Sequence, residues 1–223
     1  MLKNILITTI IILSSTLVSQ KTPQSTKDVL ANSCQEFTVT SIDGYANVHS
    51  TSEVRKNTAN IVGVLVTGTK IKITGKDRDW VKINLPITGF ISRSQIANIS
   101  CDDSMKLLMK TGVETIARLG NQATQNNSQA AQTLIRIANN STDGAISEFY
   151  SFTIADWADK NPVFLISMLK KEPVYIYKPF LRLLNFETGA PHERENFEKI
   201  LAKLPLNDPI AKYWFSIKQG QQK

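Results

Sequence analysis

The chain has 223 residues, of which 42% are hydrophobic, and this composition supports a packed core and excludes extensive disorder. Its net charge is +7 at neutral pH, and the basic residues are spread along the chain without a long run. A diffuse positive charge favours weak attraction to anionic surfaces such as cell-wall polymers or membranes. It argues against a nucleic-acid interface, which needs basic residues clustered on one face.

The N-terminus has the pattern of a secretory signal peptide, which we expect to span residues 1–20. Lys3 provides a positive charge, residues 5–13 form an apolar stretch, and residues 14–19 are mostly small. The apolar stretch is shorter than the roughly 18–20 residues that a membrane-spanning helix needs. The sequence therefore predicts cleavage near residue 20 and a periplasmic or secreted protein with no stable membrane span. The alternative is an uncleaved membrane anchor.

Cys34 and Cys101 are the two cysteines of the chain. In an exported protein an even pair of cysteines favours a disulfide. The chain-entropy model gives such a long closed loop at most about 4 kcal/mol of stabilisation. The alternative is a pair of buried free thiols. We expect neither a catalytic cysteine nor a metal site, because no histidine or further cysteine lies nearby in the sequence.

Residues 34–101 have the pattern of a small all-β domain. Short apolar or alternating runs are separated by turn residues, which is typical of a barrel or sandwich. A core of this size often needs a covalent staple, and the cysteines at both edges provide one. The expected strands are residues 37–41, 61–66, 70–74, 80–84, 89–91 and 96–99.

Residues 37–100 resemble the bacterial SH3 family. The similar segments are Asn-Val-His-Ser at 47–50, Ile-Val-Gly at 61–63, Val-Thr-Gly-Thr at 66–69, Trp-Val-Lys-Ile at 80–83 and Thr-Gly-Phe-Ile at 88–91. His49 stands where that family usually has arginine, and Phe90 where it has tryptophan. The resemblance implies a barrel of five or six strands. It also implies a targeting or binding module for peptidoglycan or a protein partner, which is not itself catalytic.

Residues 102–223 have helical periodicity and are expected to form an all-α domain. The first helix is predicted to end at Gly120, with a polar loop over residues 121–128. Prolines precede or begin several of the later helices. The fold class predicted for the whole chain is multi-domain: a signal peptide, a small all-β SH3-like barrel closed by a disulfide, and a helical domain. The further helices are expected at residues 130–139, 145–159, 163–170, 174–186, 192–204 and 210–218.

The sequence contains few candidates for catalysis, and we expect no enzyme activity and no cofactor. His49 is predicted to be a surface histidine, and His192 lies at an expected helix start. No nucleophile, zinc-binding or phosphate-binding motif is present in the sequence. Acidic residues three apart, such as Asp156 and Asp159, are interpreted as solvated helix faces. The alternative is a wall-active enzyme that uses Glu148 or Asp156.

Binding is better supported than catalysis. Alternation along residues 80–83 places Val81 and Ile83 inward, so that Trp80 and Lys82 share the outer face. Tyr45 and Asn47 alternate in the same way with Ala46 and Val48. The predicted ligand-binding residues are Tyr45, Asn47, Trp80 and Lys82, because aromatic rings on a surface can stack on a sugar or peptide.

Ligand binding is one of two interpretations of these residues that remain open. The other is that Trp80 simply covers the end of the barrel while Tyr45 packs beneath a loop.

For the function we expect an exported, non-catalytic module whose barrel recognises cell-wall peptidoglycan or a peptide, with a helical partner domain. The alternative is a periplasmic protein–protein adaptor or inhibitor.

Overall fold

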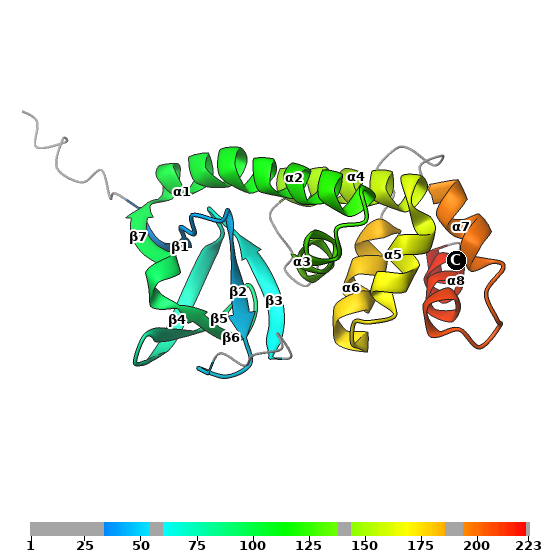
Figure 1. Cartoon of the computed structure of the whole chain (residues 1–223). Helices are drawn as coiled ribbons and strands as arrows, with labels where there is room; N and C mark the ends of the chain where they lie inside the picture. Colours follow the sequence, from blue (N-terminus) through cyan, green and yellow to red (C-terminus); the bar gives the residue numbers. More distant parts are fainter. Residues whose placement is uncertain (1–33, 54–59, 138–143, 186–193, 222–223) are drawn as a thin grey trace, which may run out of the picture. The chain divides into compact units, whose positions relative to one another are not determined.

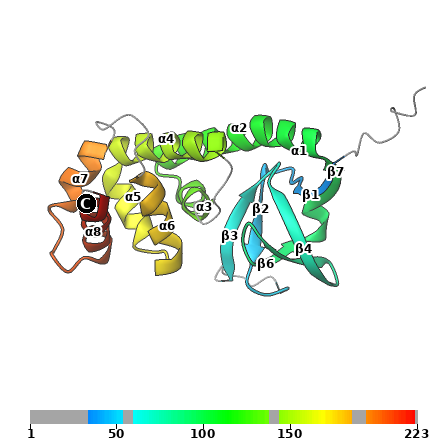
Figure 2. The same ribbon diagram turned by 180° about the vertical axis from the view of Figure 1, so that it is seen from behind.

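The computed structural model describes residues 34–53, 60–137, 144–185 and 194–221 (Figure 1). The predicted signal peptide and His192 lie outside the described residues. The described part comprises an antiparallel sheet followed by a helical region, in the order that the sequence predicts (Figure 1 and Figure 2).

The sheet has seven strands in the order β3-β2-β6-β5-β4-β1-β7, and all its pairs are antiparallel. The strands are β1 (Gln35–Val39), β2 (Tyr45–His49), β3 (Ile61–Val66), β4 (Lys70–Asp77), β5 (Trp80–Leu85), β6 (Gly89–Ser92) and β7 (Ile96–Ser100). The first and last strands of this order, β3 and β7, do not pair with each other, so the sheet is open. The prediction of a closed barrel was therefore wrong. The reason lies in β7, which pairs with β1 and then continues directly into a helix at Cys101 instead of reaching β3.

Alternation along the strands creates the core of the sheet, as the sequence predicts. Val81 and Ile83 of β5 are buried, as are Ala46 and Val48 of β2. Their neighbours along each strand face outward. The remaining members of this core are Val39, Leu65, Ile71 and Ile91.

The helical region has its own core, centred on the fully buried Trp157, Phe180 and Trp214. Its helices are α1 (Cys101–Leu107), the π-helical turn η3 (Leu108–Gly112), α2 (Val113–Thr124), α3 (Ser128–Ile137), α4 (Gly144–Lys160), α5 (Pro162–Leu169), α6 (Val174–Leu184), α7 (Glu195–Leu201) and α8 (Pro209–Gln221). Within the described residues, no helix combines the length and the apolar character needed to cross a membrane.

Helix α2 continues to Thr124, so the prediction that the first helix ends at Gly120 was wrong. Gly120 is a packing residue. A Cβ atom at this position would lie 2.3 Å from the Thr153 side chain of α4. The glycine therefore lets two helices approach closely. In a sequence, a glycine within a helical pattern can indicate either such a contact or the end of the helix.

The sheet and the helices are joined by apolar packing and by a buried chain of hydrogen bonds. Val64 and Val66 of β3 belong to the helical core, whereas Leu65 between them belongs to the core of the sheet. Thr38 Oγ1 donates to Ser104 Oγ at 3.0 Å, and Ser104 Oγ donates to the carbonyl of Gly68 at 3.2 Å. Strand β3 therefore contributes side chains to both cores.

Helix α8 is capped by a buried carboxylate. Asp208 Oδ1 accepts hydrogen bonds from the backbone N–H groups of Ile210 and Ala211, and Lys170 Nζ lies 2.7 Å from Oδ2. Burial acts to raise the pKa of Asp208. The hydrogen bond from Lys170 and those from the two N–H groups outweigh burial, so the pKa lies below the ordinary value of 3.8.

We expect Asp208→Ala to lower the free energy of unfolding by about 1–2 kcal/mol at neutral pH, because it removes a helix cap. A lowered pKa stabilises the fold above pH 3.8, and this stabilisation is lost as the pH falls through the folded-state pKa. Urea unfolding of both proteins across acidic pH tests this. The difference in the free energy of unfolding between the wild type and Asp208→Ala should become smaller at low pH. A difference that does not change with pH would show that the ionised carboxylate does not stabilise the fold.

Candidate ligand-binding site

A pocket of about 310 Å³ lies beside Trp80, at the tip of the β4–β5 hairpin. Its lining comes from the hairpin and from the segment that follows β2: Ser52, Glu53, Asp77, Arg78, Asp79 and Trp80. We call this the Trp80 pocket.

The hairpin turn presents charged groups around the indole. Asp77 and Trp80 are cross-strand partners, and Arg78 and Asp79 form the turn between them. Arg78 adopts a φ of 53°, in the left-handed region that tight turns use. The backbone N–H of Arg93 donates to the Asp79 carbonyl at 2.8 Å and holds the turn against the short 3₁₀ helix η2 (Arg93–Gln95), which follows β6.

Trp80 is held from the side by a buried polar network. The His49 and Trp80 rings meet edge to face, with centroids 5.1 Å apart. His49 Nδ1 donates to Asn60 Oδ1 at 3.2 Å in the tautomer that this contact requires. Asn60 Nδ2 in turn donates to the carbonyl of Glu53 at 2.6 Å. The network therefore fixes both the indole and the backbone that carries an acidic residue of the pocket.

His49 is buried, with 9% of its surface exposed, so the prediction of a surface histidine was wrong. The strand register shifts between Val48 and His49, and this irregularity interrupts the simple alternation along β2. The imidazole contacts the Trp80 ring edge to face and has a hydrogen-bonding partner in Asn60. Its geometry is that of a supporting residue.

The predicted binding residues lie in two separate places. Trp80 lines the pocket, and Lys82 is exposed on the same face of β5. Tyr45 and Asn47 pair with Val66 and Val64, whose side chains pack in the helical core. Because cross-strand partners share a face, Tyr45 and Asn47 lie on the face of β2 that is turned to the helices.

Tyr45 lines a second and smaller cavity of about 220 Å³. Its ring packs against the helical core, and the cavity around it is bordered by Arg118, Gln122 and Gln129 of α2 and α3. Arg118 Nη2 donates to the carbonyl of Asp43 at 3.0 Å, which ties α2 to the loop before β2. Tyr45 therefore does not contribute to the Trp80 pocket.

The carboxylates of the Trp80 pocket were missed by the sequence analysis. Glu53, Asp77 and Asp79 are exposed and border the pocket together with one cation, Arg78. The acidic groups outnumber the basic one, although the chain as a whole carries a charge of +7. The sequence Asp-Arg-Asp-Trp at residues 77–80 could have indicated these carboxylates, because the hairpin turn between two alternating strands brings both aspartates beside the tryptophan.

The acidic residues considered for catalysis lie on helices, and several are engaged in ion pairs. Asp156 pairs with Lys160 at 2.8 Å, four residues later on α4. Glu195 and Glu198 of α7 are another acidic pair three residues apart, and Glu198 pairs with Lys218 of α8 at 2.6 Å. These contacts agree with the interpretation of the acidic residues as solvated helix faces.

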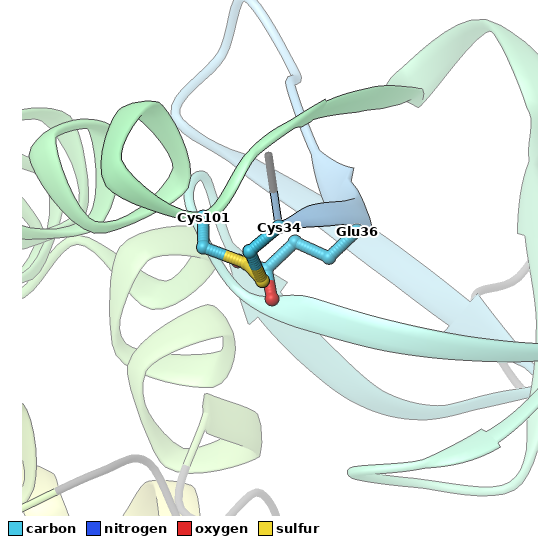
Figure 3. A group of neighbouring side chains, drawn as sticks. All are labelled: Cys34, Glu36 and Cys101. Carbon is cyan, nitrogen blue, oxygen red and sulfur yellow. A yellow bond between two sulfur atoms is a disulfide. The ribbon is translucent and has the colours of Figure 1, made fainter. Parts of the chain in front are cut away.

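Cys34 and Cys101 form a disulfide, which confirms the pairing predicted from the sequence (Figure 3). The bond joins the residue before β1 to the first residue of α1, and the two Cα atoms lie 5.4 Å apart. Glu36 lies beside the two sulfur atoms. A disulfide in the structure is consistent with an extracellular location.

Comparison with known proteins does not assign the chain to a family: no protein-family model, no curated protein and no solved structure matches it. The resemblance of residues 37–100 to the bacterial SH3 family therefore stays a prediction.

Proposed function

We propose that this protein is an exported, non-catalytic binding module that holds a peptide carrying a positively charged group in the Trp80 pocket, with cell-wall peptide as the main candidate. The observation that carries the proposal is the combination of a half-buried indole with three carboxylates around one hollow. An aromatic face attracts cations, and nearby carboxylates strengthen that attraction. Peptides of the bacterial wall carry free amino groups of this kind.

The buried residues that hold Trp80 in place favour specific recognition over non-specific adsorption. His49 and Asn60 are buried, and His49 contacts the indole edge to face, so little side-chain freedom is lost when a ligand binds. Trp80 is also a convenient reporter. The chain has three tryptophans, and Trp157 and Trp214 are fully buried. A change in solvent-sensitive fluorescence on ligand addition therefore reports mainly on Trp80.

We expect Trp80→Ala to weaken binding to purified peptidoglycan or its soluble peptides at least tenfold, which corresponds to about 1.4 kcal/mol. Co-sedimentation and calorimetry measure this without relying on the lost fluorophore. Tyr175→Ala is the matched control, because it removes an exposed aromatic ring from α6, away from the pocket. Equal binding by wild type and Trp80→Ala would contradict the proposal.

The charge of the pocket gives an independent test. We expect the double variant Asp77→Asn and Asp79→Asn to weaken binding of an amine-bearing peptide several-fold, and rising salt to weaken wild-type binding. The same peptide with its amino groups acetylated should bind the wild type and the variant alike. Asp156→Asn, on helix α4 and outside the pocket, is the control for the loss of a negative surface charge.

A protein–protein adaptor or inhibitor is a second candidate, and one observation favours it. A hollow of about 370 Å³ between α7 and α8 is lined mainly by apolar groups, among them Leu204, Leu206 and Phe215. Leu206 is fully exposed. A stoichiometric complex in a pull-down from periplasmic extract that survives Trp80→Ala but not Leu206→Asp would favour the adaptor over the wall-binding module.

A further inference from the structure

Three potential metal ligands meet where the sheet passes into the helices. Residues two apart along a strand project to the same face, so Glu36 of β1 points the same way as Cys34 just before that strand. Cys101 begins α1 opposite them. The two sulfur atoms and a carboxylate oxygen of Glu36 all lie within 4.8 Å of one another (Figure 3).

Glu36 has an oxygen that lacks a partner. Its Oε2 atom pairs with Lys70 Nζ at 3.2 Å. Its Oε1 atom is buried and has no hydrogen-bond partner within the described part of the chain. A buried carboxylate oxygen without a partner is destabilising, and an unpaired group of this kind calls for an explanation such as a bound ion. The carboxylate that carries this unpartnered oxygen belongs to the same small group as the two sulfur atoms.

We propose that reduction of the Cys34–Cys101 disulfide converts the group of Cys34, Glu36 and Cys101 into a Zn²⁺ site. The ligands are the two thiolates and the Glu36 carboxylate, and water occupies the fourth position of a tetrahedron. A dithiol supplies the two electrons and two protons that break the S–S bond, and it becomes a disulfide itself. Zn²⁺ then replaces the two thiol protons, which pass to solvent. Exchange with the disulfide form of that dithiol runs the step in reverse: the two thiolates pass two electrons to that disulfide, the Cys34–Cys101 bond forms again, and Zn²⁺ is released.

The backbone keeps the ligands together without the covalent bond. The N–H of Cys101 donates to the carbonyl of Cys34 at 2.9 Å. The β1–β7 pairing continues from Gln35 opposite Ser100, so the 5.4 Å spacing of the two Cα atoms rests on the sheet as well as on the disulfide. With Zn–S bonds of about 2.3 Å, a tetrahedral ion holds two sulfurs about 3.8 Å apart, which side-chain rotation can reach.

Charge and ligand type favour zinc over harder ions. Two thiolates and one carboxylate carry three negative charges, which Zn²⁺ and the neighbouring Lys70 balance together. Thiolate ligands select soft or borderline ions, so Mg²⁺ and Ca²⁺ are disfavoured. The disulfide form has no thiolate to offer. The site is therefore expected to bind metal in one redox state alone, independently of the Trp80 pocket.

Cobalt substitution tests the proposal directly. The purified protein is reduced with a water-soluble phosphine, which offers no thiol to the metal, and is titrated with Co²⁺ without oxygen. We expect one equivalent of Co²⁺ to give thiolate-to-cobalt charge-transfer absorption that Zn²⁺ abolishes. Circular dichroism of the same sample reports whether the reduced protein stays folded. The oxidised protein should give no such absorption.

Matched variants identify the third ligand. Glu36→Gln keeps the shape of the side chain and should weaken Co²⁺ and Zn²⁺ binding at least tenfold. Glu114→Gln, which changes an exposed acidic residue on α2, should leave metal binding unchanged. Three results would each overturn the proposal: no charge-transfer band in the reduced protein, unfolding on reduction, or equal affinity in wild type and Glu36→Gln.

Discussion

Replacement of Gly68 by alanine is expected to lower the free energy of unfolding by about 3 kcal/mol or more, because two unfavourable effects combine. Gly68 has a φ of +91°, which side-chain-bearing residues rarely adopt. A Cβ atom there would also lie 2.2 Å from the backbone nitrogen of Leu108 and 2.3 Å from its Cα atom. Backbone atoms cannot rotate away, so the π-helical turn η3 would have to move off the sheet.

Gly220→Ala is the matched control for this change. A Cβ atom at Gly220 meets nothing within 4 Å, and the residue lies in helix α8. Alanine should therefore stabilise this helix slightly, by up to about 1 kcal/mol. Urea unfolding of the wild type and both variants gives the comparison. If Gly68→Ala unfolds at the same urea concentration as the wild type, the contact between Gly68 and η3 is not a structural constraint.

Much of the fold could be predicted from local sequence patterns. Residues 61–66 alternate little, yet their β-branched apolar character predicts β3 with the bounds observed. Pro162 correctly marks the start of α5. Closure of the sheet could not be predicted in this way, because it depends on which strands pair at the edges. The position of β7 between β1 and α1 decides that question, and no local pattern encodes it.

The candidate site could be predicted only in part, because strand alternation separates inward from outward residues but does not show which outward residues remain accessible. Alternation correctly assigns Val81 and Ile83 to the inside, and therefore leaves Trp80 and Lys82 outside. Alternation does not reveal that helices cover one outward face of the sheet. Tyr45 and Asn47 follow the same rule, yet they lie opposite residues of β3 that pack in the helical core. Which faces stay open to a ligand is a property of the tertiary structure.

Removal of the Glu172 carboxylate is expected to destabilise the protein by about 3–5 kcal/mol, since it leaves a buried charge without its partner. Glu172 lies in the α5–α6 connection, with its side chain fully buried. Its two oxygens accept hydrogen bonds from Gln132 at 2.8 Å and from Arg136 Nε at 3.1 Å, both on α3. Glu172→Ala removes the carboxylate that pairs with the guanidinium of Arg136, whose side chain is only 10% exposed.

A double-mutant cycle separates the interaction from the loss of packing. Arg136→Met and Glu172→Ala should each lower the free energy of unfolding, whereas the double variant should be less destabilised than the sum of the two. Asp156→Ala is the surface control. It breaks an exposed ion pair with Lys160 and should change stability by under about 1 kcal/mol.

The size of the coupling energy measured in this cycle shows how Arg136 and Glu172 stabilise the fold. Desolvation of two charges opposes their attraction, so the pair as a whole can contribute little even though the loss of either member is severe. Additive losses in the cycle would mean that Arg136 and Glu172 act through packing alone. Strong coupling would mean that Glu172 fixes the α5–α6 connection against α3 by charge, because Arg136 has this carboxylate beside it in a site with little access to water.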